Sequence, residues 1–123
     1  MANDPDNFGI LLGPEIPTRG YRAGETIFHE GDRGKEFFVI RSGKVEIRIG
    51  NRLLETLGEN EIFGEMALID EAPRSATAVA ATDVTAAQIT EKQYLFLVRH
   101  TPFFALKVMR VLAQRLRKLD KSG

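Results

Sequence analysis

Two charged residues, Glu65 and Arg74, lie in a segment whose other residues are mostly small or apolar. The segment covers residues 64–78, reads GEMALIDEAPRSATA, and includes Met66 and Ile69. Because an ionised side chain is costly to bury unless it is paired or binds a ligand, we expect each charge to have a partner. A guanidinium forms paired, charge-assisted hydrogen bonds with phosphate oxygens, which makes Arg74 a candidate anion-binding residue.

The neighbours of Arg74 supply further donors for an anion. Ser75 has a hydroxyl and Ala76 a backbone amide. The helix-forming residues after Gly64 predict a short turn with free N–H groups at its start. A phosphate would repel Glu65, so we expect this carboxylate to accept a hydrogen bond from a sugar hydroxyl while Arg74 balances its charge. A phosphate beside a sugar indicates a nucleotide.

A simpler interpretation of the same residues is also open. Glu65 and Arg74 would then form only an internal ion pair that fixes the loop to the rest of the domain, since paired charges in loops are common. The two interpretations differ in what the loss of Arg74 would do. The first predicts a loss of ligand binding, and the second predicts a loss of stability.

Short strand-like runs with turn residues between them surround this segment and predict a β sandwich or barrel. The runs are residues 37–40, 45–49, 52–57, 77–79 and 84–89. Glycine-containing turns between the first three runs predict hairpins. The domain is predicted over residues 21–120, after an arm or short helix at residues 1–20 and before a tail at residues 121–123.

Two helices are predicted after the strands. The capping-box pattern of Thr90 and Gln93 predicts a helix that ends near Arg99. Pro102, which follows a threonine N-cap, predicts a second helix that ends near Asp120.

The second helix has more apolar surface than a single contact needs. One row, which we expect to cover the barrel, contains Ala105, Met109, Leu112, Leu116 and Leu119. A neighbouring row contains Phe104, Val108, Val111 and Arg115. This helix is therefore expected to pack on the barrel alone, or on the barrel and a partner, which would be another protein or a second copy in a parallel dimer.

Composition narrows the class of protein. The 123 residues fit one domain, and 17 basic residues balance 17 acidic ones, so no overall field attracts nucleic acid or an anionic membrane. The absence of cysteine excludes disulfides and thiolate metal sites. No apolar run is long enough to span a membrane. We expect a cytoplasmic protein without a nucleic-acid or membrane partner.

The run IFGEMALIDEAPRSATA, residues 62–78, resembles the phosphate-binding cassette of the cyclic nucleotide-binding domain family. This family includes bacterial catabolite activators, regulatory subunits of cAMP-dependent kinase and cyclic-nucleotide-gated channels. The resemblance extends from about residue 21 to residue 119 and includes AGETIF, EGD and RSGKV at residues 23–28, 30–32 and 41–45. It implies a mainly β fold, an eight-stranded jelly-roll barrel (a cupin-like double-stranded β-helix) with a short cassette helix and two C-terminal helices.

The resemblance also implies a role for each cassette residue. Arg74 would bind the cyclic phosphate together with Ser75 and the amide of Ala76, and Glu65 would bind the ribose 2′-hydroxyl. The start of the cassette and its amides would complete the cradle: Phe63, Gly64, Met66 and Ala67. No cofactor is implied. A serine at position 75 is similar to members that prefer cAMP, so cAMP is the expected ligand and cGMP the alternative.

Two features of the resemblance stay open. In this family a residue of the final helix closes over the purine, and the candidates here are Arg110, Gln114, Arg117, Leu119 and Asp120. An arginine among them would stack on the adenine ring. The chain ends where bacterial transcription regulators of this family continue into a helix-turn-helix. It is expected to be either a stand-alone sensor or the sensor part of a longer regulator.

Two other classes compete with a nucleotide sensor. An enzyme of the cupin type would share the barrel but needs several metal ligands, and the two histidines, His29 and His100, are not expected to meet. The sequence has no P-loop and no plausible Ser/His/Asp set. The other class is an adaptor domain that binds no ligand. We expect a non-enzyme without a metal, in which nucleotide binding shifts the final helix.

Overall fold

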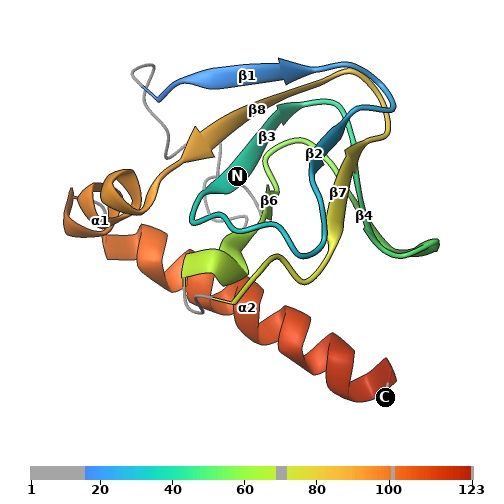
Figure 1. Cartoon of the computed structure of the whole chain (residues 1–123). Helices are drawn as coiled ribbons and strands as arrows, with labels where there is room; N and C mark the ends of the chain where they lie inside the picture. The colour runs from blue at the N-terminus through green and yellow to red at the C-terminus, as the bar shows by residue number, and fades with distance from the viewer. Residues whose placement is uncertain (1–15, 69–71, 101, 123) are drawn as a thin grey trace.

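The structure is a computed structural model that describes residues 16–68, 72–100 and 102–122. Its described residues form eight strands in two four-stranded antiparallel sheets (Figure 1). The first sheet has the order β1 (Thr18–Tyr21), β8 (Val84–Ile89), β3 (Phe37–Ser42) and β6 (Ile62–Phe63). The second has the order β2 (Thr26–Phe28), β7 (Thr77–Ala80), β4 (Val45–Ile49) and β5 (Arg52–Leu57). This arrangement confirms the predicted jelly-roll barrel.

The first strand and the last helix lie at the two ends of the described chain. Strand β1 begins at Thr18, inside the segment predicted as an arm, because Thr18 to Tyr21 pair in register with Ala87 to Val84. Residues 1–15 lie outside the described residues. At the other end the last helix continues to Ser122, into the predicted tail.

Alternation along β3 gives the domain two apolar cores. Phe38 and Ile40 point into the space between the two sheets, where Phe63 also lies. Phe37 and Val39 point to the opposite face, which the C-terminal helices cover. Because successive side chains of a strand face opposite sides, a strand that is buried on both faces is apolar throughout, as β3 is over its first four residues.

The helices α1 (Glu91–His100) and α2 (Pro102–Ser122) follow β8, as predicted. Thr90 caps α1. The backbone amide of Gln93 donates to the Thr90 hydroxyl at 3.2 Å, and the backbone amide of Thr90 donates to Gln93 Oε1 at 2.9 Å. This confirms the capping box. Within the described residues, neither helix is long and apolar enough to cross a membrane.

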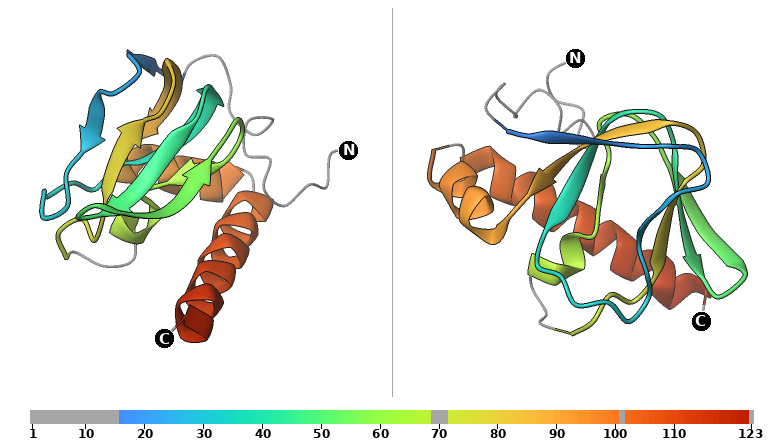
Figure 2. Two further views of the ribbon diagram at one scale, coloured as in Figure 1. Left: turned by 90° about the vertical axis from the view of Figure 1, so that its right-hand side faces the viewer. Right: turned by 45° about the horizontal axis from the view of Figure 1, so that its top comes forward.

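Helix α2 lies along one side of the barrel (Figures 1 and 2), and residues from both predicted rows face it. Leu112 of the row expected to cover the barrel is buried, but Met109 of that row is 57% exposed, and the neighbouring row is buried at Phe104, Val108 and Val111. Phe104 packs between Phe37 and Tyr94, with ring centroids 6.2 and 5.9 Å away. A bulky ring fills this space better than Ala105 would, so the helix is turned toward Phe104.

Candidate functional site

The backbone of Arg74 is fixed to the loop between β2 and β3. Its amide donates to the carbonyl of Asp32 at 2.8 Å, and its carbonyl accepts a hydrogen bond from the Gly31 amide at 2.8 Å. This pairing places the start of the Arg-Ser-Ala run beside residues that are distant in the sequence. These two backbone bonds therefore position Arg74 independently of its side-chain contacts.

Two backbone carbonyls hold the guanidinium of Arg74. Nη1 donates to the carbonyl of Gly64 at 3.0 Å, and Nη2 donates to the carbonyl of Glu36 at 2.7 Å. Only 6% of the side chain is exposed. A guanidinium has five N–H donors, so these two bonds fix its plane and leave donors for an anion.

The space around the guanidinium depends on an aromatic ring and two glycines. The guanidinium carbon lies 4.3 Å from the ring centroid of Phe28, within the range of a cation–π contact. A Cβ atom on Gly34 would lie 2.9 Å from Nη2, and one on Gly64 would lie 3.0 Å from Nη1. Gly64 also has a φ of +79°, which disfavours other residues.

Burial and nearby carboxylates act on Arg74 in opposite directions. Burial lowers the pKa of Arg74, while the negative charges of Glu36 and Asp32 raise it. The Glu36 carboxylate is close, with Oε1 3.7 Å from Nη2. Because a guanidinium has a pKa far above neutrality, Arg74 remains a cation and can bind an anion.

Glu65 is paired with Arg115 of α2, and not with Arg74 as expected. Glu65 is the first residue of the short helix η2 (Glu65–Leu68) and is 4% exposed. Its carboxylate accepts a hydrogen bond from Arg115 Nη1. Arg115 Nη2 also donates to the carbonyl of Ile62 at 2.8 Å. Because η2 packs against α2 while Arg74 turns toward the loop before β3, the two charges of the cassette have separate partners.

Arg115 was not among the predicted site residues. The sequence feature that could have indicated it is its position on α2, in one row with Phe104, Val108 and Val111. The structure buries these three residues. A cation on an apolar row needs a buried acceptor. Glu36, Phe28 and Gly34 also line the site and had no such signal, because a loop brings them there.

The other predicted site residues are placed as follows. Phe63 is buried and stacks on Phe38 with centroids 4.9 Å apart, so it is part of the core below the site. Met66 and Ser75 are exposed, and Ala76 is half-buried. Ala67 lies within η2. Of the candidate purine lids, Arg110 and Gln114 are exposed, and the side chains of Arg117, Leu119 and Asp120 lie outside the described residues.

Each histidine has a contact close to it in the sequence. His29 Nδ1 lies 3.7 Å from Asp32 Oδ2, and the ring centroid of His100 lies 4.3 Å from that of Phe96. In the part of the chain that the structure describes, no group of histidine and acidic residues could hold a metal ion.

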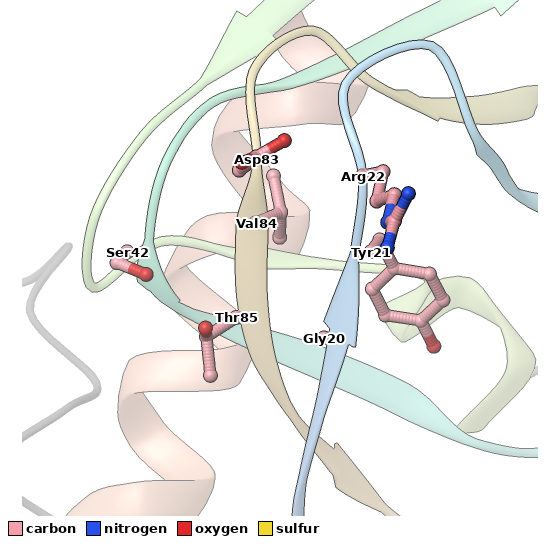
Figure 3. Close-up of a pocket in the computed structure, with 7 residues that line it drawn as sticks. All are labelled: Gly20, Tyr21, Arg22, Ser42, Asp83, Val84 and Thr85. Atoms are coloured by element: carbon pink, nitrogen blue, oxygen red, sulfur yellow. The ribbon is translucent and has the colours of Figure 1, made fainter.

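A separate pocket lies near the start of β8 and contains no cassette residue (Figure 3). Ser42 and Thr85 lie on one side of the β1–β8 pair, and the Tyr21 ring lies on the other. Asp83 uses its carboxylate here to accept a hydrogen bond from the Ala23 amide at 2.9 Å. This carboxylate therefore stabilises a turn.

The chain belongs to the cyclic nucleotide-binding domain family, whose sequence pattern matches residues 18–101. The cyclic AMP receptor protein of Thermus thermophilus is 41% identical over 107 residues, which are 83% of this chain and 50% of that protein. The crystal structure of the Thermus thermophilus catabolite activator protein is similar, with a TM-score of 0.79 and 38% identity over 90% of this chain and 58% of that one.

An EAL enzyme in its cGMP-bound form is also similar, with a TM-score of 0.65 and 39% identity over 86% of this chain and 30% of that one. The chain thus spans about half the length of the Thermus relative and a smaller part of the enzyme.

Gly34→Ala tests whether the space around the guanidinium matters for binding. The added methyl group would push Arg74 Nη2 away, so we expect the affinity for a cyclic nucleotide to fall about tenfold. Titration calorimetry measures this change. The control is Gly20→Ala, because a Cβ atom on Gly20 would have no atom within 4 Å. Equal affinities of the two variants would show that the position of Arg74 does not limit binding.

Proposed function

We propose that this domain is a sensor that binds a cyclic nucleotide, cAMP in preference to cGMP, and that binding shifts α2. The observation that carries the proposal is the buried guanidinium of Arg74. Two backbone carbonyls hold it, and it lies within the matched domain, in the segment that resembles the cassette of the family. An arginine held in this way has donors ready for phosphate oxygens.

In this proposal the cassette residues bind different parts of the nucleotide. Arg74 binds the cyclic phosphate, assisted by the hydroxyl of Ser75 and the amide of Ala76. Glu65 accepts a hydrogen bond from the ribose 2′-hydroxyl, while Arg115 keeps its charge balanced. Separate cations for the carboxylate and the phosphate avoid competition for one guanidinium.

The preference for cAMP is a further step of the proposal. It is supported by Ser75, which resembles members that prefer cAMP, and by the similarity to a cyclic AMP receptor protein. Structures of the EAL enzyme exist in a cAMP-bound and a cGMP-bound form, so that protein binds both nucleotides. The purine lid stays a prediction, with Arg110, Gln114 and Arg117 as its candidates.

Arg115 supports a coupling between the nucleotide and α2. It is a residue of α2 whose side chain bonds the cassette at Glu65 and at the carbonyl of Ile62. In this proposal, the bond that Glu65 forms with a ribose hydroxyl changes the geometry of its bond to Arg115. A ligand shifts a conformation only by as much as it binds the two states differently, and this contact gives such a difference.

We further propose that the domain is regulatory, cytoplasmic and without catalytic activity or a cofactor. Its partner would be a protein or a second copy that binds beside α2, where Phe103 and Met109 are 73% and 57% exposed. The balance of 17 basic and 17 acidic residues favours a domain that does not itself contact nucleic acid. In a longer regulator, the shift of α2 would act on the output part.

Titration calorimetry with cAMP, cGMP and linear 5′-AMP tests the proposal, using protein that has been unfolded and refolded to remove bound nucleotide. We expect cAMP to bind with micromolar or tighter affinity, cGMP more weakly and 5′-AMP much more weakly. Hydrogen exchange in α2 should change when cAMP saturates the protein. A folded protein that binds none of the three is an adaptor, and unchanged exchange would exclude the shift of α2.

A further inference from the structure

We propose that Glu36 is an internal counter-anion of Arg74, which the phosphate has to displace, and that it thereby lowers the affinity of the site. This inference rests on the proposed binding of a cyclic nucleotide at Arg74. It assigns to Glu36 a role in setting the ligand concentration to which the domain responds.

Glu36 contacts Arg74 in two separate ways. Its backbone carbonyl, at the edge of β3, accepts the 2.7 Å hydrogen bond from Nη2. Its carboxylate lies farther away, with Oε1 3.7 Å from the same nitrogen. Among the described residues, this is the one carboxylate within 4.0 Å of the guanidinium. The carbonyl positions Arg74, and the carboxylate balances its charge.

The two side chains differ in their freedom to move. Arg74 is 6% exposed, and Phe28 and the two carbonyls hold it in place. The side chain of Glu36 is 35% exposed and forms no hydrogen bond with Arg74 through its carboxylate. A long, partly exposed ion pair is weak, so an incoming anion can replace the carboxylate without moving the guanidinium.

A phosphate at Arg74 would lie close to this carboxylate. The two anions repel each other, and the repulsion is stronger beside a buried group than in bulk water. Glu36 therefore has either to turn into solvent or to accept an unfavourable neighbour. Both alternatives reduce the free energy that nucleotide binding releases.

Glu36→Gln separates the carboxylate from the carbonyl, because it removes the charge and leaves the backbone bond to Nη2. We expect cAMP to bind about threefold to tenfold more tightly to this variant than to the natural chain. Glu36→Ala should change affinity in the same direction, and it serves if the glutamine variant does not fold. A loss of structure would weaken binding, so tighter binding cannot arise from damage to the fold.

The matched control is Glu46→Gln. Glu46 is a partly exposed carboxylate of β4 that is paired with Arg48 at 2.9 Å, so the change removes the same charge from the chain and leaves Arg74 and Glu36 in place. Its affinity for cAMP should equal that of the natural chain. An equal gain in both variants would indicate an effect of net charge and overturn the proposal.

The outcomes also separate this inference from the proposed function. If the natural chain and Glu36→Gln both fail to bind cAMP, the proposed function is wrong. If the natural chain binds and Glu36→Gln binds equally or more weakly, the function stands and the inference is overturned. Weaker binding would mean that the carboxylate helps to hold Arg74 in the bound state.

Discussion

Arg74→Met is expected to weaken cAMP binding at least about a hundredfold, the largest effect on binding in this domain. Methionine fills a similar volume but has no charge and no donors, so a buried phosphate would lose its main partner. The carbonyls of Gly64 and Glu36 would also lose their donor. The free energy of unfolding should therefore fall by about 1 to 3 kcal/mol. Calorimetry and chemical denaturation measure the two quantities.

Two further variants sharpen this test. Arg74→Lys retains the charge but loses the fork that bonds both carbonyls, so its affinity should lie between those of the natural chain and Arg74→Met. Arg52→Met, at an exposed position of β5, should change neither affinity nor stability. If folded Arg74→Met bound cAMP as the natural chain does, Arg74 would have only a structural role.

Arg115→Met is expected to lower the free energy of unfolding by about 2 to 4 kcal/mol. It leaves Glu65, which is 4% exposed, without the cation that the structure pairs with it. Arg115 itself is 23% exposed at its side chain, so the cost should be smaller than for a fully buried pair. Binding should weaken as well, because Glu65 loses the contact that positions it.

A double-mutant cycle with Glu65→Gln measures the coupling of the two residues. Once the carboxylate has become an amide, the loss of Arg115 should cost less, and we expect a coupling of about 1 to 3 kcal/mol. Arg99→Met, at an exposed position of α1, controls for the loss of a helical arginine. Additive effects of the two changes would show that the Glu65–Arg115 contact does not stabilise the domain.

Many elements of the fold follow from short-range patterns. The five predicted runs are strands, and Thr90 and Gln93 begin α1 as their capping box predicts. These features depend on neighbours in the sequence, namely side-chain alternation in strands and hydrogen bonds across three residues at a helix start. A local pattern therefore suffices to predict them.

Local sequence patterns did not predict which face of α2 is buried, nor the first strand. Both rows of α2 are mainly apolar, and the structure buries Phe104 and Val108 together with Leu112 of the other row, because the space below Phe37 admits a ring. Three of the four residues of strand β1 are exposed, so its sequence lacks the apolar alternation that predicts a strand. Its pairing with β8 fixes it in the sheet.

The sequence by itself determined which residues of the cassette carry charge, the strands on either side of it and the family to which the chain belongs. Only the tertiary structure decided the partners of those charges. Arg74 is held by Gly64 and Glu36, and Glu65 is held by Arg115. Glu36 and Arg115 are distant from their partners in the chain, and a local pattern gives no account of contacts that form only when the loop before β3 and helix α2 pack against the cassette.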